Sequence, residues 1–145
     1  MSFTHSIVYI EDNLADFILL KKSLDKSDIK DIQLQHIADG EEALTYFNNI
    51  EANDDQLVPD LIVLDVNLPR VDGFEILEKI KNSHKLKKIP TIMYSTSQYK
   101  EEINRAYALH ANSYIVKSFD NEDCINSIKS LSSYWFRTVN LPKEK

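Results

Sequence analysis

The four-residue apolar run at 61–64, Leu-Ile-Val-Leu, ends on Asp65, and a turn-rich segment then leads to Gly73. A short apolar run between turn residues predicts a strand that is buried on both faces, which is typical of a parallel sheet. A carboxylate that directly follows such a strand lies at the carboxyl end of the sheet, where open α/β folds form their ligand sites. Asp65 is therefore either a functional carboxylate or simply a cap for the segment that follows.

The rest of the chain alternates between strand and helix patterns. Apolar or alternating runs predict further strands at 6–10, 32–37, 91–94 and 113–116. Helical spacing predicts helices from residue 15, from 39 through 47, and at 74–82, 100–109 and 121–136, with a polar surface excursion at 49–58 and a left-handed residue at Asn112. Because strands separated by helices imply right-handed crossovers, we expect an α/β, flavodoxin-like (βα)5 fold, a doubly wound parallel sheet of order 2-1-3-4-5.

Composition limits the class of protein. The 145 residues are 43% hydrophobic and 28% charged, which predicts one globular domain over 1–145, with its core at about 6–131 and a helix end and tail at 132–145. A net charge of −6 argues against nucleic acid or an anionic membrane as a partner, and no apolar run is long enough to span a bilayer. We therefore expect a cytoplasmic protein. The single cysteine, Cys124, permits no internal disulfide and is expected to be either a packing residue or a surface residue.

Polar side chains follow four of the five predicted strands at the point where each strand ends. Glu11 and Asp12 follow the first strand, Asp65 the third, Ser95 the fourth and Lys117 the fifth. Because the carboxyl ends of parallel strands meet at one edge of the sheet, these five side chains should converge.

A group of three carboxylates, a hydroxyl and an ammonium can bind both a cation and a phosphoryl group. Clustered carboxylates repel one another unless they are protonated or neutralised by a cation, and oxygen ligands suit Mg²⁺. The Lys117 ammonium can neutralise phosphoryl oxygens, and the Ser95 hydroxyl can donate a hydrogen bond to one. The pattern therefore predicts a site for phosphoryl transfer, in which Asp65 attacks and becomes an acyl phosphate.

These residues together resemble the response-regulator receiver domain of bacterial two-component signalling, over about residues 6–131. The matching positions are Glu11, Asp12, Asp65, Asn67, Pro69, Gly73, Ser95 and Lys117. The resemblance implies that a sensor histidine kinase phosphorylates Asp65, and that Ser95 and Lys117 contact the phosphoryl oxygens. It also implies that Asp12, Asp65 and the backbone carbonyl of Asn67 bind Mg²⁺, with Glu11 acting through water.

The resemblance also implies a conformational switch. Tyr114 stands at the family's aromatic switch position, and Ser95 would move toward the phosphoryl group so that the tyrosine ring turns inward. The alternative is that Tyr114 is an ordinary half-buried strand aromatic. We expect Asn67 and Ser97, which flank the pocket, to tune the lifetime of the phosphoryl group.

Three features depart from the compact members of the family. Ser118 follows Lys117 where a proline is usual, which leaves open whether this peptide bond is cis or trans. The interval between Asp12 and Asp65 is long, and the chain closes on the segment 132–142, SSYWFRTVNLP. These features are similar to the single-domain regulators that partner bacterial phytochrome kinases. The expected phosphodonor is such a kinase, another sensor kinase or a phosphotransfer protein.

The signal is expected to leave the domain by protein contact. The residues after 136 are too few for an output module, and Tyr134, Trp135 and Phe136 form an aromatic cluster at the end of the last predicted helix. Consecutive residues point to different sides of a helix, so at least one of the three should be exposed. We expect a homodimer through the helix at 100–109, the strand at 113–116 and the last helix.

Two rival functions fit these residues less well. A phosphorylation-independent adaptor would have no reason to keep all five site residues. A phosphatase of the haloacid dehalogenase type needs a second acid two residues after its nucleophile, where Asn67 stands. We expect no enzymatic turnover beyond the domain's own phosphorylation and dephosphorylation. The histidines lack metal-ligand spacing, and the basic run at 79–88 is expected to form a solvated face.

Overall fold

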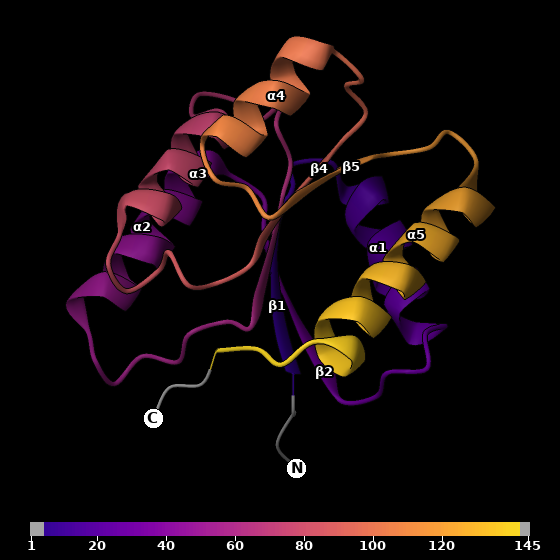
Figure 1. The fold of residues 1–145 in the computed structure, drawn as a ribbon, viewed down its shortest axis with the longest axis horizontal. Helices are drawn as coiled ribbons and strands as arrows, with labels where there is room; N and C mark the ends of the chain where they lie inside the picture. Colours follow the sequence, from indigo (N-terminus) through magenta and orange to yellow (C-terminus); the bar gives the residue numbers. More distant parts are fainter. Residues whose placement is uncertain (1–4, 143–145) are drawn as a thin grey trace.

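Five parallel strands form one sheet, with helices on both of its faces (Figure 1). The computed structural model describes residues 5–142. The strands are β1 His5–Ile10, β2 Ile32–Ile37, β3 Leu61–Leu64, β4 Thr91–Ser95 and β5 Ser113–Val116, and they are hydrogen-bonded in the order β2-β1-β3-β4-β5. The predicted flavodoxin-like topology is confirmed, and β2 and β5 are the edge strands.

Polar residues after the strands start most of the helices. The helices are α1 Leu14–Asp25, α2 Gly40–Ala52, α3 Gly73–Asn82, α4 Lys100–Ala108 and α5 Asn121–Ser133, and a π-helical turn, η1 Tyr134–Thr138, follows α5. At α1, α2, α3 and α5 an Asn or Asp side chain accepts hydrogen bonds from first-turn amides. These caps, at Asn13, Asp39, Asp72 and Asp120, fix where each helix leaves the edge of the sheet that carries the predicted site.

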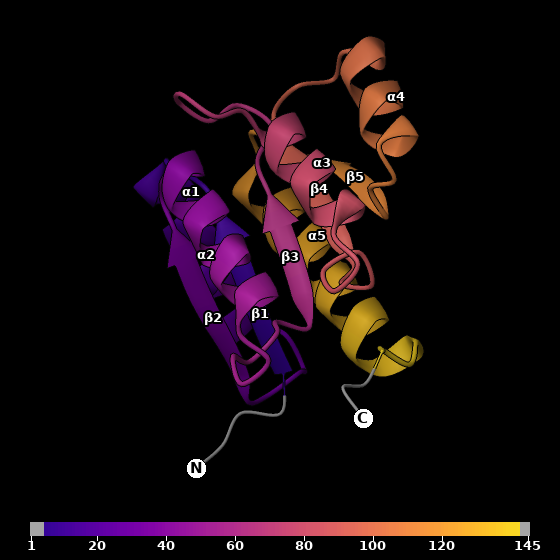
Figure 2. The same cartoon turned by 90° about the vertical axis from the view of Figure 1, so that its left-hand side faces the viewer.

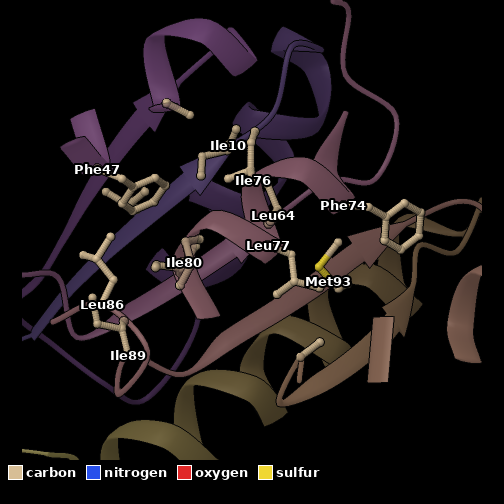
Figure 3. Packing of buried hydrophobic residues seen from close by; sticks show 14 of the residues in the cluster. Ile10, Phe47, Leu64, Phe74, Ile76, Leu77, Ile80, Leu86, Ile89 and Met93 are labelled. Atoms are coloured by element: carbon tan, nitrogen blue, oxygen red, sulfur yellow. The ribbon is translucent and has the colours of Figure 1, made fainter. Parts of the chain in front are cut away.

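The core consists of two layers, one on each face of the sheet. Figure 2 views the molecule from the side of α2 and α3. Alternate residues of β1 enter different layers: Val8 and Ile10 pack with α2 and α3, whereas Ile7 and Tyr9 pack with α1 and α5. Figure 3 shows the first layer, where Phe47 of α2 and Ile80 of α3 lie close to the strands. β3 is buried on both faces, as its uninterrupted apolar sequence predicts.

The segment after α2 differs from the prediction. The helix continues to Ala52 instead of ending near Phe47, so residues 49–52 are helical and are not part of a surface excursion. Lys85 holds the end of the helix, because its ammonium donates to the carbonyls of Ile50 at 2.8 Å and Asn53 at 3.0 Å. A cation on the last carbonyls of a helix stabilises them, a tertiary interaction that the local sequence pattern does not reveal.

The prediction of a solvated basic face at 79–88 was wrong for three of its lysines. Lys85 caps α2, Lys79 forms an ion pair with Glu51 at 2.6 Å, and Lys81 is half-buried. The Lys81 ammonium donates to the carbonyls of Lys87 and Ile89 and to the side-chain oxygen of Asn112. These lysines therefore connect α3 to its neighbours instead of forming a solvated face.

Two further residue-level predictions were wrong. The residue with left-handed backbone after α4 is His110, with φ 74°, and not Asn112. The Asn112 side chain instead accepts the amide of Thr91 at 2.8 Å and joins β5 to the start of β4. On α1, the helical spacing of Leu14, Phe17, Ile18 and Leu24 predicts one buried face, but Leu14 and Ile18 are exposed.

Gly73 brings the start of α3 against the end of β3. A Cβ at this position would lie 2.1 Å from the carbonyl oxygen of Asp65 and 2.8 Å from the Cα of Val66. The Gly73 amide donates to the carbonyl of Val66 at 2.9 Å. Only glycine permits this close approach, which fixes the backbone of the residue that carries the central carboxylate.

We predict that Gly73→Ala lowers the free energy of unfolding by about 1–3 kcal/mol, because the added methyl group must displace backbone and not a flexible side chain. Urea denaturation followed by circular dichroism measures this change. Asn82→Ala, at an exposed position in the last turn of the same helix, is the control and should change stability by no more than about 0.5 kcal/mol. A Gly73→Ala variant as stable as the parent would contradict the close approach.

Candidate functional site

Three predicted carboxylates converge at the carboxyl edge of the sheet. Oxygen atoms of Glu11, Asp12 and Asp65 all lie within 4.8 Å of one another. Glu11 and Asp65 are buried, whereas Asp12 is exposed. The β1 and β3 strands are neighbours in the sheet, and their ends at Ile10 and Leu64 lie in register. That register brings the acids together, as the strand-end argument predicts.

The predicted lysine reaches the same group of acids. The Lys117 ammonium is buried and forms ion pairs with the Oε1 of Glu11 and, at 3.0 Å, with the Oδ2 of Asp16, while the Oδ1 of Asp65 lies 3.9 Å away. Burial alone would lower the pKa of Lys117, but the carboxylates of Asp65 and Glu11 raise it above the usual value. Lys117 therefore carries a positive charge at the bottom of an acidic site.

Glu11 is the most enclosed of the acids, with 1% of its surface exposed. Its Oε1 accepts a hydrogen bond from the hydroxyl of Tyr9 at 3.0 Å as well as the contact from Lys117, and its Oε2 accepts the amide of Asn13 at 3.2 Å. A ring nitrogen of His36 lies 2.6 Å from its backbone carbonyl. A buried charge is tolerated when it is paired and hydrogen-bonded in this way.

Asp65 lies in the low-dielectric part of the site, with 6% of its surface exposed. Burial raises the pKa of its carboxyl group to about 7; the Lys117 ammonium opposes this rise and the Glu11 carboxylate adds to it. An additional positive charge beside this carboxyl group would stabilise its ionised form. The electrostatics of the site therefore favour the binding of a cation.

The donor set fits a hard divalent cation. All three side chains offer oxygen, and opposite ligands of an octahedral Mg²⁺ are separated by about 4.2 Å, which is close to the span of this cluster. Asn67, whose carbonyl is the third predicted direct ligand beside Asp12 and Asp65, is an exposed residue in the loop after β3. The acidic cluster is thus a candidate divalent-metal site.

Ser95 and Tyr114 are linked through Ser97. Ser95 is fully buried as the last residue of β4, and its hydroxyl oxygen accepts the amide of Ser97 at 3.1 Å. The hydroxyl of Tyr114, a half-buried residue of β5, donates to the carbonyl of Ser97 at 3.0 Å. The amide of Lys117 in turn donates to the carbonyl of Ser95 at 2.7 Å. These contacts connect the site to the edge strand.

The structure also answers questions that the sequence left open. No peptide bond in residues 5–142 is cis, so the bond between Lys117 and Ser118 is trans. Cys124 is buried and is therefore a packing residue, not a surface residue, and its thiol lies 3.1 Å from the carbonyl of Ser118. Of the aromatic cluster, Tyr134 is 50% exposed while Trp135 and Phe136 pack against the core, which confirms that at least one ring faces solvent.

Sequence reasoning missed three residues of the site. Asp16, Tyr9 and His36 contact Lys117 or Glu11 but were not singled out. Asp16 stands one helical turn after Asp12, which is the signal that could have identified it. Tyr9 and His36 lie inside strand patterns, where an aromatic residue is expected for packing alone.

None of the helices described in residues 5–142 is long and apolar enough to cross a membrane.

Comparisons with known proteins agree with this geometry. The sequence family "response regulator receiver domain" matches residues 7–129. The response regulator Rcp1 of Synechocystis sp. is 35% identical over 94% of this chain and 92% of its own length. The crystal structure of the Mn²⁺-bound form of Rcp1 superimposes with a TM-score of 0.87 at 34% identity, covering 96% of this chain and 99% of that one.

The crystal structure of the phosphorylated cyanobacterial phytochrome response regulator RcpA superimposes with a TM-score of 0.88 at 36% identity, again over 96% of this chain and 99% of that one. The family match spans most of the chain, and it includes the buried acid–lysine site at the carboxyl edge of the sheet. The chain therefore belongs to the response regulator receiver domain family, the phosphorylation-accepting receivers of two-component signalling.

Proposed function

We propose that Asp65 is the phosphoacceptor of this receiver domain, and that a sensor histidine kinase supplies the phosphoryl group. The observation that carries this proposal is the placement of the buried Asp65 carboxylate among two further acids and the Lys117 ammonium. The acids would bind a divalent cation, and the ammonium would pair with a phosphoryl oxygen. Both the cation and the phosphoryl group would therefore find a partner of opposite charge in the site.

The proposed step is a displacement at phosphorus. An oxygen of Asp65 forms a bond to the phosphorus of a phosphohistidine or an acyl phosphate, and the bond from phosphorus to the donor nitrogen or oxygen breaks with its electron pair. Asp12, Asp65 and the Asn67 carbonyl would hold Mg²⁺, with Glu11 acting through water. When bound, the ion would neutralise charge on the carboxylates and phosphoryl oxygens. Lys117 would pair with one phosphoryl oxygen, and the hydroxyl of Ser95 would donate to another.

The contacts among Ser95, Ser97 and Tyr114 suggest how the signal leaves the site. If the Ser95 hydroxyl turns toward a phosphoryl oxygen, it gives up the hydrogen bond that it accepts from the Ser97 amide. The carbonyl of Ser97, which holds the Tyr114 hydroxyl, is then free to move. Two positions of the Tyr114 ring would thereby be coupled to the charge on Asp65, and the surface of α4 and β5 would change with them.

The kinase partner is proposed from similarity. RcpA is a cyanobacterial phytochrome response regulator, and a further similar structure is the bacteriophytochrome response regulator RtBRR, at 28% identity. These resemblances favour a phytochrome-type histidine kinase as the phosphodonor of this chain.

We predict that acetyl phosphate with Mg²⁺ adds one phosphoryl group to the protein, and that Asp65→Asn abolishes the addition. Glu11 is already paired with Lys117 and hydrogen-bonded by Tyr9, and Asp12 is exposed, so neither acid should replace Asp65. Intact-mass spectrometry measures the gain. Asp55→Asn, at an exposed position in the loop after α2, is the charge-matched control and should be modified like the parent.

The same experiment separates the proposal from the adaptor alternative. Loss of modification when Mg²⁺ is removed with a chelator would support the proposed metal dependence. An unmodified parent protein that also fails to bind Mg²⁺ would instead favour an adaptor whose pocket has no chemical role.

A homodimer through α4, β5 and α5 is also proposed. The outer edge of β5 has no partner strand among the described residues, and a hollow of about 650 Å³ lies beside it. Ile115, Leu131, Tyr134 and Trp135 line this hollow. A half-exposed apolar surface beside a free strand edge favours protein contact over exposure to water.

We predict that sedimentation velocity detects a dimer of the parent protein and that Tyr134→Glu shifts it to the monomer, because a charge would be buried in the interface. Leu57→Glu, at an exposed position in the loop between α2 and β3, is the control outside the proposed interface and should leave the dimer intact. A parent protein that sediments as one chain, with and without acetyl phosphate, would refute the proposed interface.

A further inference from the structure

We infer that Asp16 is a positioning residue for Lys117. The Asp16 carboxylate holds the Lys117 ammonium away from Asp65 in the unphosphorylated protein, and it competes with the phosphoryl group for that ammonium. This inference rests on the proposed function, because it assigns a role in controlling the same site. Asp16 lies in the first turn of α1, outside the set of strand-end residues that form the site.

The distances around the ammonium are unequal. The Nζ of Lys117 contacts Oε1 of Glu11 directly and lies 3.0 Å from Oδ2 of Asp16, whereas 3.9 Å separates it from Oδ1 of Asp65. An N–H to carboxylate hydrogen bond requires roughly 2.7–2.9 Å, so Asp65 lies outside hydrogen-bonding range. Two of the three N–H groups of the ammonium are thus directed to Glu11 and Asp16, which leaves Asp65 without a hydrogen bond from Lys117.

The two acids that hold Lys117 are not equivalent. Glu11 is buried and needs the ammonium to offset its charge, whereas the Asp16 side chain is 37% exposed and is solvated without it. The backbone of Asp16 is fixed independently, because its amide donates to the side chain of Asn13 at 3.0 Å. Asp16 is therefore a fixed acceptor at the rim of the site that can lose Lys117 at little cost.

A phosphoryl group on Asp65 changes this balance. It adds negative charge on the side of the ammonium that faces Asp65, so Lys117 must shift toward Asp65 and weaken its contact with Asp16. The Asp16 carboxylate opposes that shift. Its removal should make the ammonium more available and strengthen the binding of any phosphoryl-like anion at Asp65.

The test compares Asp16→Asn with the parent, using beryllofluoride as the phosphoryl analogue at saturating Mg²⁺. Isothermal titration calorimetry should show a dissociation constant about three- to tenfold lower for Asp16→Asn, the scale expected for one partly exposed charged contact. The control is Asp25→Asn, which removes the same charge from the exposed last residue of the same helix and should not change the constant.

A second measurement separates positioning from simple charge repulsion. The ¹H–¹⁵N signal of the Lys117 side-chain ammonium should differ between the parent and Asp16→Asn without Mg²⁺ or beryllofluoride, and the two signals should converge once beryllofluoride is bound. Tighter binding with an unchanged resting signal would mean that Asp16 acts only by repulsion, and would overturn the inference.

Failure of the inference differs from failure of the proposed function. Equal dissociation constants for the parent and Asp16→Asn overturn the role of Asp16 and leave Asp65 as the phosphoacceptor. A parent protein that binds no beryllofluoride overturns both.

Discussion

A single buried ammonium, that of Lys117, stands against an excess of carboxylates, and the structure at the carboxyl edge of the sheet depends on this imbalance. Lys117 and Glu11 form a buried ion pair, and removing one member of such a pair costs about 3–5 kcal/mol. The two residues follow β5 and β1, which β3 and β4 separate in the sheet. The four strands must therefore end at one level for the pair to form.

The same excess of carboxylates makes the site sensitive to added charge. With Glu11, Asp12 and Asp65 so close together, one lysine does not neutralise the charge, and burial leaves the pKa of Asp65 at about 7. In the proposed function, a divalent cation and a phosphoryl group would add charges of opposite sign to this acidic site. Under this proposal, Lys117 would redistribute its contacts when those charges are added. The carboxylates that contact Lys117, and not the fold as a whole, would then determine how the site responds to phosphorylation.

The sequence predicted the fold closely, because buried parallel strands are short apolar runs and their ends are marked by polar residues. β2, β3 and β5 have the predicted limits, and the three carboxylates with Lys117 lie together as expected. What the sequence did not show depends on tertiary contacts made by long or exposed side chains. Lys85, in the loop after α3, holds the end of α2, and Asp16 in the first turn of α1 reaches Lys117 at the end of β5. Local periodicity carries no information on either contact.

The most direct test of the account is to locate the modified atom. After treatment with acetyl phosphate and Mg²⁺, borohydride reduces an aspartyl phosphate to homoserine, which peptide mass spectrometry can place in the sequence. The account predicts homoserine at position 65 and at no other aspartate. Homoserine at position 12 or 16, or an acid-stable phosphate on a serine such as Ser95, would contradict the assignment of Asp65 as the phosphoacceptor.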